Sequence, residues 1–303
     1  MRNNGISHQG NGDINVSGVV AMGSHTSATS HAAPVAVAEQ SVPASPRPEP
    51  PQSWDAGVVT VLPVETRALI DALSRRGAHH KEVTPHGVRF HQFSWDAAGR
   101  TVRVVVTQSL LPGQQSAGNA VAYLRQSFAP RLLALVGIGG SVHPDVHVGD
   151  VVIAQEIVHY EPRKITPEGV RRRGRSHPVT ARVQHAINDF FTENGEPWPL
   201  PEGPDHRALR GLIGSGEAVI AHVDAAERRY LSVYNEKILA VETEGAGLVE
   251  AVHAAANEAG TPEPWLVVRG MSDEADSHKD DSRHELAGRN AAAVFCGLLP
   301  HLL

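Results

Sequence analysis

Short apolar runs alternate with amphipathic stretches along the chain from Trp54 to its last residue. The apolar runs are short and rich in β-branched residues, and they predict strands near 57–62, 88–95, 101–107, 131–138, 150–158, 209–214, 238–242 and 265–271. Apolar positions spaced three and four apart predict helices near 65–76, 116–127, 179–193, 244–259 and 282–299. Strands that alternate with helices indicate an α/β layered domain with a largely parallel sheet.

Residues 1–53 lack this pattern. Up to Ser30 the chain is rich in Gly, Asn, Ser and His, and from Ala33 to Ser53 it is rich in Pro and Ala. Such a composition cannot bury enough apolar surface to fold alone, so we predict a disordered, low-complexity segment that ends in a Pro-rich linker. The globular domain is therefore predicted to occupy residues 54–303.

One part of this segment, residues 12–23, alternates apolar and polar positions, with Ile14, Val16, Val20 and Met22 at even numbers. Alternation with Asn, few charges and no Pro is typical of stacking cross-β segments. The stretch is similar to the Gly/Asn-rich N-terminal motifs proposed as amyloid-type signalling segments in bacterial immune proteins. Two interpretations stay open: a tail without structure, or a self-assembly or adaptor motif.

The bulk composition argues against several classes of protein. The formal net charge is −6 and the pI is near 6.3, which leaves no basic surface for nucleic acid or for anionic membranes. No stretch approaches the roughly 18 apolar residues of a membrane helix, and the single Cys296 cannot form a disulfide within the chain. We therefore expect a cytoplasmic protein. The 18 histidines show no metal-ligand spacing, so neither a metal nor a cofactor is expected.

Carboxylates follow two of the apolar runs. Glu242 and Glu244 stand where the run near 238–242 ends, and Asp273 follows the run near 265–271. Ligands in open α/β sheets bind at the carboxyl ends of strands. Packing alone does not explain these acids, because a buried carboxylate is costly unless it is paired or hydrogen-bonded. The pattern therefore predicts a ligand site built around the three carboxylates.

Five motifs in a fixed order resemble one known family across nearly all of residues 54–303. They are 61–65, 136–140 followed by 148–150, 214–217, 241–244 and 268–273. In these motifs the chain resembles the nucleoside phosphorylase and nucleosidase superfamily, and within it the methylthioadenosine/S-adenosylhomocysteine nucleosidase-like branch. The resemblance implies a three-layer α/β/α fold around a mixed, largely parallel sheet, and a homodimer. It also implies an enzyme that hydrolyses the N-glycosidic bond of a purine nucleoside or nucleotide.

The resemblance assigns roles to the acids. Asp273 would protonate N7 of the purine, because the base leaves poorly until its ring nitrogen gains a proton. Glu244 would hold the ribose 2′- and 3′-hydroxyls. Glu242 would line the same site, or instead structure its loop or pair with Arg269, which would order the loop that carries Ser272 and the acid. From the residues alone, Asp273 could equally cap a turn and Glu244 could favour the start of a helix.

Glu65 would orient the attacking water, although Thr66 stands at the expected position in an ungapped alignment. Ile138 and Gly139 lie in a glycine loop, 137–140, that would let a ligand approach the backbone closely. Phosphorolytic relatives carry an arginine and a serine or threonine around this loop to hold phosphate, whereas the residues here are apolar. Water is therefore favoured over phosphate as the nucleophile.

Two positions depart from the pattern of the family. Val219 stands where an aromatic residue usually stacks on the base, and Thr243 stands where the nearest relatives carry methionine. Base recognition is therefore expected to be altered, with Tyr160 as another candidate for stacking. The basic run at 171–175 is interpreted as a solvated loop, or as a lid that meets the phosphates of a nucleotide.

Three other functions stay open from the sequence. A phosphorylase would require inorganic phosphate. A non-catalytic sensor would bind a nucleoside and signal through its N-terminus. A self-assembling adaptor would act chiefly through residues 1–30.

Overall fold

The computed structural model describes residues 54–303, apart from 202, 204, 260–262 and 276–281. The predictions made for residues 1–53, a disordered segment and a motif near 12–23, lie outside the described residues and stay predictions. Among the helices of the described part, none combines the length and apolar character needed to span a bilayer.

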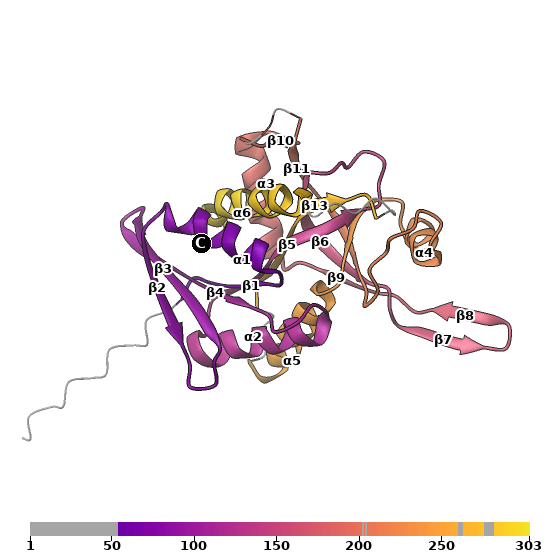
Figure 1. The fold of residues 1–303 in the computed structure, drawn as a ribbon, viewed down its shortest axis with the longest axis horizontal. Coiled ribbons are helices and arrows are strands. Elements are labelled where there is room, and N and C mark those ends of the chain that lie inside the picture. Colours follow the sequence, from indigo (N-terminus) through magenta and orange to yellow (C-terminus); the bar gives the residue numbers. More distant parts are fainter. Residues whose placement is uncertain (1–53, 202, 204, 260–262, 276–281) are drawn as a thin grey trace, which may run out of the picture. The chain divides into compact units, whose positions relative to one another are not determined.

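A mixed sheet forms the centre of the described domain (Figure 1). Its strands are β1 (Ala56–Thr60), β2 (Ala78–Val83), β3 (Arg89–Ala97), β4 (Arg100–Gln108), β5 (Leu132–Ser141), β6 (Val151–His159), β9 (Arg175–Pro178), β10 (Trp198–Pro199), β11 (Arg207–Ser215), β12 (Ile238–Glu242) and β13 (Trp265–Asp273). The main path runs β10-β11-β6-β13-β5-β1-β4-β3-β2, while β12 pairs with β11 and β5, and β9 pairs with β6. Parallel pairing joins β4, β1, β5 and β13, and β6 continues from β13 in the antiparallel sense.

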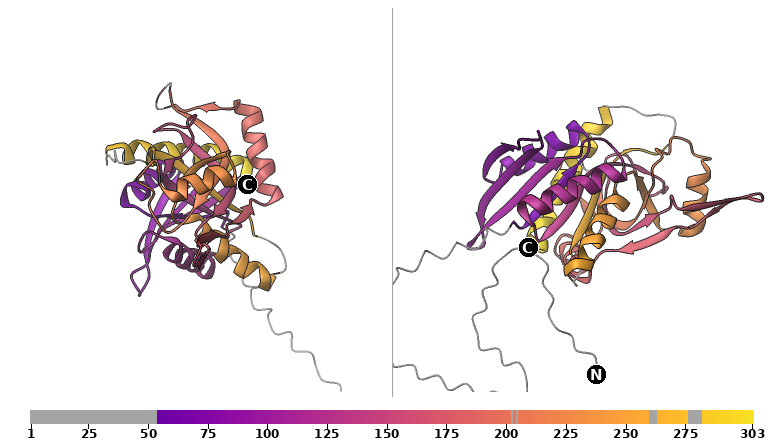
Figure 2. Two further views of the ribbon diagram at one scale, coloured as in Figure 1. Left: turned by 90° about the vertical axis from the view of Figure 1, so that its right-hand side faces the viewer. Right: turned by 90° about the horizontal axis from the view of Figure 1, so that it is seen from below.

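Helices cover both faces of this sheet. They are α1 (Pro63–Ser74), α2 (Gln114–Phe128), α3 (Ala181–Asn194), α4 (Ala226–Tyr234), α5 (Gly245–Ala259) and α6 (Ser282–Leu302). Helices α1 and α3 pack against α6 in one layer, and α2 packs against α5 in the other (Figure 1, Figure 2). The predicted three-layer α/β/α fold is therefore confirmed.

The central strands are apolar because both of their faces are covered. Every residue of β1 and β13 is buried, as expected for parallel strands between two helix layers. The strands predicted near 88–95 and 101–107 are present as β3 and β4, which pair in the antiparallel sense as a hairpin. Ala98 and Gly99 form its two-residue turn with φ values of 51° and 78°, the left-handed conformation that such a turn requires.

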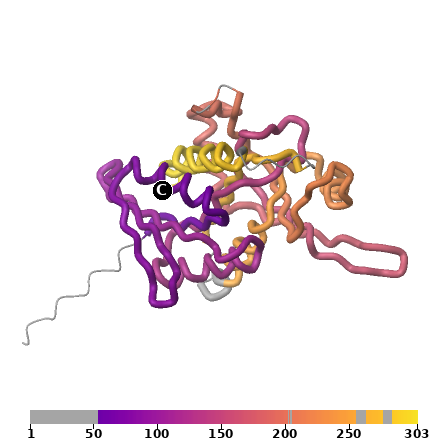
Figure 3. The backbone as a smooth tube through the Cα atoms, in the orientation of Figure 1, coloured from indigo at the N-terminus to yellow at the C-terminus, as the bar shows by residue number. Residues whose placement is uncertain are grey.

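The interpretation of the basic run at 171–175 as a loop was wrong except for residues 173–174, and its role as a lid stays a prediction. The run contributes to β8 (Gly169–Arg172) and β9, and β8 pairs with β7 (Arg163–Thr166) in a separate two-stranded arm. Figure 3 shows this arm leaving the body of the domain. Arg172 anchors its base through a 2.6 Å ion pair with Glu227 and contact with the ring of Tyr230, both on α4. Polar, exposed strands carry no alternating pattern, so the arm and β2 were missed.

Candidate active site

An open cavity of about 220 Å³ lies where β5, β12 and β13 end. Residues from segments far apart in sequence line it: Val61, Leu62, Glu65, Pro112, Ile138, Gly139, Gly140, Ala218, Val219, Ile220, Val241, Glu242, Thr243, Glu244, Ser272, Asp273 and His284. Of the residues predicted for the site, all are in this lining except Arg269 and the stacking candidate Tyr160, which are both fully buried. The structure therefore brings the predicted acids together at one end of the sheet.

Arg269 is the buried centre of the cluster of acids. Its Nη2 donates to Glu242 Oε2 at 2.5 Å and to Glu244 Oε2 at 2.8 Å, and its Nη1 lies 4.0 Å from Glu65 Oε1. Burial by itself would lower the pKa of Arg269, but the three carboxylates outweigh it and raise that pKa. The guanidinium thus neutralises part of the charge that the glutamates bring into the interior.

Glu242 orders the start of α5. Its Oε2 accepts hydrogen bonds from the backbone N–H groups of Glu244 at 3.0 Å and Gly245 at 2.7 Å, in addition to Arg269. These are N–H groups at a helix start, where an acceptor side chain is favourable. Both alternatives raised for Glu242, a structural contact within the loop and a pair with Arg269, are present together.

Glu65, rather than Thr66, faces the cavity. Its Oε2 accepts from the backbone N–H of Val61 at 2.7 Å and Leu62 at 2.8 Å, and its Oε1 accepts from Ile138 N at 2.8 Å. Thr66 turns back into the fold, where its hydroxyl lies 2.8 Å from that of Thr60. Burial raises the pKa of Glu65, although Arg269 and the three backbone donors act in the opposite direction.

Asp273 closes the cavity at the end of β13. Its Oδ1 accepts from the backbone N–H of Ala275 at 2.9 Å, and its Oδ2 lies 3.0 Å from the hydroxyl of Ser272. The local turn contact considered for Asp273 is therefore present. Asp273 is nonetheless only 7% exposed as a residue while still lining the cavity, so its carboxyl can reach a molecule bound there.

The prediction of a glycine loop at 137–140 was wrong, because these residues lie in β5. Gly137 and Gly140 make room there for side chains of the site. A Cβ atom on Gly137 would lie 2.5 Å from both Arg269 Nη1 and Glu65 Oε1. One on Gly140 would lie 2.8 Å from Asp273 Oδ1. The charged groups of the site therefore approach this backbone closely, and the expected approach of a ligand to Ile138 and Gly139, which line the cavity, stays a prediction.

The two candidates for base stacking differ in position. Val219 lines the cavity and is 64% exposed. Tyr160 is fully buried, packs in a cluster with Ile220 and Val241, and does not line the cavity. No Phe, Tyr or Trp occurs among the described residues of the lining.

Sequence reasoning missed several contributors to the site. Pro112 and His284 line the cavity, and the backbone N–H of Gly113 donates to Glu244 Oε1 at 2.8 Å. The only signal for Gly113 was a Pro-Gly pair before a predicted helix. Such a pair indicates a turn, but it does not indicate which residue the N–H of Gly113 contacts. Nothing near His284 distinguished it from the other histidines.

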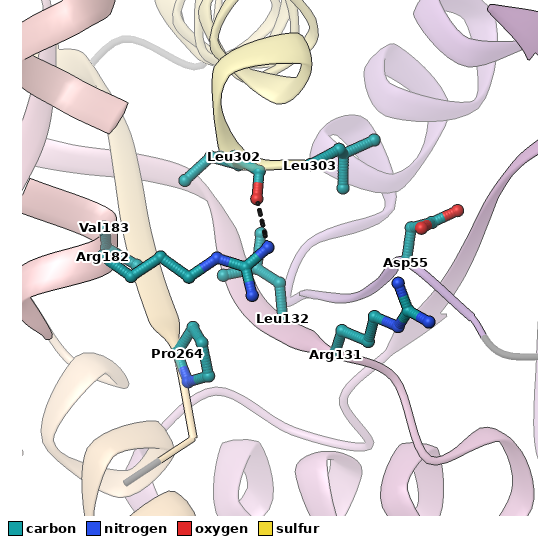
Figure 4. Close-up of a pocket in the computed structure, with 8 residues that line it drawn as sticks. All are labelled: Asp55, Arg131, Leu132, Arg182, Val183, Pro264, Leu302 and Leu303. Atoms are coloured by element: carbon teal, nitrogen blue, oxygen red, sulfur yellow. Dashed lines mark hydrogen bonds between the residues drawn. The ribbon is translucent and has the colours of Figure 1, made fainter. Parts of the chain in front are cut away.

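A second, much smaller hollow does not share this chemistry. The hollow in Figure 4 lies among Asp55, Leu132, Arg182 and Leu302, at the start of β1 and β5. Its volume is about 10 Å³, roughly room for one water, and Arg182 crosses it to donate to the carbonyl of Leu302 at 3.2 Å. It cannot hold a nucleoside.

The comparisons with known proteins agree with the fold and with the motifs. Residues 55–303 match the family model described as the phosphorylase superfamily. An ATP nucleosidase, Cap17, of Escherichia coli (strain KTE188) is 23% identical over 80% of this chain, which spans 50% of that protein. A 5′-methylthioadenosine/S-adenosylhomocysteine nucleosidase of Aeromonas salmonicida (strain A449) is 28% identical over 66% of this chain and 82% of its own length.

A solved structure shows the same fold. The 5′-methylthioadenosine/S-adenosylhomocysteine nucleosidase of S. pneumoniae, with a transition-state inhibitor, aligns with a TM-score of 0.64 at 24% identity. The alignment covers 82% of this chain and all of the other. Since the family model extends over almost the whole described domain, the resemblance predicted from the five motifs is confirmed: the chain belongs to the phosphorylase superfamily.

Proposed function

We propose that the protein hydrolyses the N-glycosidic bond of a purine nucleoside or nucleotide and releases the free base. The observation that carries the proposal is the convergence of Glu65, Glu244 and Asp273 on one cavity. The nucleosidase names of several relatives support the same reaction class.

Asp273 serves as the general acid in this proposal. A proton delivered to N7 turns the purine into a better leaving group, and a positioned acid contributes about 10²–10⁴-fold. The hydroxyl of Ser272 and the backbone of Ala275 hold the carboxyl in place. Val219 offers the base an apolar but non-aromatic wall at the cavity mouth.

Glu244 grips the ribose, and Arg269 together with Glu242 holds it in position. Positive charge develops on the sugar as the glycosidic bond breaks, and hydrogen bonds to the ring hydroxyls strengthen in that oxocarbenium-like transition state. A buried anion beside the sugar favours this charge. The buried guanidinium holds the carboxylates of Glu242 and Glu244 in position through its hydrogen bonds.

Water is the proposed nucleophile, oriented by Glu65. Four carboxylates line the cavity, and the described residues of the lining include no Lys or Arg. Arg269 is already engaged by glutamates, so an incoming phosphate would meet mainly negative charge. Hydrolysis is therefore favoured over phosphorolysis.

A homodimer is also proposed. Leu110, Leu111 and Tyr123 are 90%, 64% and 48% exposed and line one groove beside the cavity. Apolar side chains gathered in this way are typical of protein contact sites. Sedimentation of the purified protein tests this proposal, and a monomer at micromolar concentration would contradict it.

A role as a regulated effector in a bacterial immune pathway is proposed from the joining of this domain to the low-complexity residues 1–53. The enzyme would then be silent until those residues assemble. A variant that lacks residues 1–53 cannot assemble in this way, so it should stay inactive in cells under conditions that activate the full chain. If instead it behaves like the full chain, the segment has no such role.

The reaction is tested by incubating the purified protein in phosphate-free buffer with adenosine, inosine, methylthioadenosine, S-adenosylhomocysteine, AMP and ATP. Free base is measured by chromatography. We expect base release that Asp273→Asn abolishes and that Asp145→Asn, at an 82% exposed side chain, leaves intact. Release only after phosphate is added would identify a phosphorylase, while ligand binding without release would identify a sensor.

A further inference from the structure

The carboxylate of Glu244 is almost fully occupied by donors from the protein. Its Oε1 accepts from Thr243 Oγ1 at 2.5 Å and from Gly113 N at 2.8 Å, and its Oε2 accepts from Arg269 Nη2 at 2.8 Å. An ionised carboxylate offers about four lone-pair sites. Three are filled, so Glu244 has one site left on Oε2 and none on Oε1.

A vicinal diol needs two acceptor sites. If Glu244 binds the ribose 2′- and 3′-hydroxyls, one of its present donors must leave. The Gly113 N–H is fixed by the backbone at the start of α2. Arg269 is fully buried and is bound to Glu242 as well. Neither can withdraw without disturbing the surrounding structure.

Thr243 is the donor that can move. Its side chain lines the cavity and is only half-buried. Its hydroxyl reaches Glu244 by rotation about a single bond, χ1, which has three staggered positions. Turning to another position frees Oε1 without moving the backbone.

We propose that the hydroxyl of Thr243 is a placeholder for a ribose hydroxyl on Glu244, and that substrate binding exchanges one for the other. This inference rests on the proposed role of Glu244 in gripping the sugar. Thr243 then lowers the preference for a ribose diol, because a ligand with both hydroxyls must break the 2.5 Å contact and a ligand without them need not. It is a specificity-determining residue that acts through Glu244.

The test measures binding by calorimetry in the Asp273→Asn background, so that bound nucleoside is not cleaved. The probes are adenosine and 2′,3′-dideoxyadenosine, and the variants are Thr243→Val and Thr243→Ser. Valine keeps the shape of threonine but lacks the hydroxyl, whereas serine keeps the hydroxyl. Thermal melting of each variant confirms that it is folded.

We expect Thr243→Val to bind adenosine about three- to tenfold more tightly, because no internal hydrogen bond has to be broken. Its affinity for 2′,3′-dideoxyadenosine should stay within about twofold of the parent. Thr243→Ser should restore the parent affinity for adenosine. A merely structural role would change both ligands alike.

The other outcomes overturn the inference. Unchanged or weaker adenosine binding by Thr243→Val means that the hydroxyl does not compete with the sugar. Equal tightening for both probes means that the diol is not involved. Either result leaves the proposed function standing, whereas a failure of both parent and variants to bind adenosine, together with no base release from any tested substrate, overturns both.

Discussion

Arg269 and Glu244 lie 25 residues apart in the sequence, and the guanidinium of one donates a 2.8 Å hydrogen bond to the carboxylate of the other in the interior. Both side chains are almost completely shielded from water, at 1% and 5% exposure. Such a pair is costly to break, because removing one partner leaves an uncompensated buried charge.

Replacing Arg269 should therefore destabilise the fold as well as the site. We expect Arg269→Met to lower the free energy of unfolding by about 3–5 kcal/mol in urea titrations followed by circular dichroism. Arg163→Met, which removes a 2.9 Å pair with Glu161 on the arm, should cost less than about 1 kcal/mol. Equal losses for the two variants would show that Arg269 does not hold the cluster together.

Glu65 should make stability depend on pH. Its pKa is raised above the ordinary 4.5 chiefly by burial, so the folded state favours the protonated form. This favourable contribution is complete below the unfolded pKa and is lost as the pH rises through the folded pKa. The unfolding free energy of the wild type, minus that of Glu65→Gln, should therefore fall between pH 4.5 and neutrality. A difference that is flat across this range would contradict the raised pKa.

Gly137 should not tolerate a side chain. The Cβ atom of Gly137→Ala would lie 2.5 Å from Arg269 Nη1 and Glu65 Oε1, so both groups must shift. We expect a loss of about 1–3 kcal/mol in stability, measured by urea unfolding, together with a loss of base release. Gly288→Ala on α6 is the matched control, since its nearest neighbour lies at 3.7 Å and a helical alanine is favourable.

An aromatic residue at position 219 should improve binding of the base. Val219 lies at the cavity mouth, and aromatic stacking contributes about 0.5–1.5 kcal/mol. Val219→Phe should therefore lower KM by about two- to tenfold with unchanged stability. Val223→Phe introduces the same ring in the same loop, at a 56% exposed position outside the lining, and should leave KM unchanged. A lower KM in both variants would point to a non-specific surface effect.

The local pattern of apolar and polar residues was sufficient to predict those strands and helices that other elements cover. The buried strands β1, β5 and β13 stand out because a parallel strand between two helix layers is apolar along most of its length. The two-stranded arm and β2 gave no such signal, because exposed strands face water and need no apolar alternation. Their existence depends on hairpin pairing and, for the arm, on the anchor between Arg172 and Glu227.

The sequence by itself determined which residue types could do chemistry here, because acids placed after apolar strands must meet at the edge where those strands end. Tertiary structure alone decided how they are used. It placed Glu65 rather than Thr66 in the cavity, set Arg269 between three carboxylates, and brought Gly113 to Glu244 across 131 residues. Such contacts depend on the direction of side chains and on the packing of distant segments. Neither produces a periodic pattern of apolar residues in the sequence, so neither could be predicted from it.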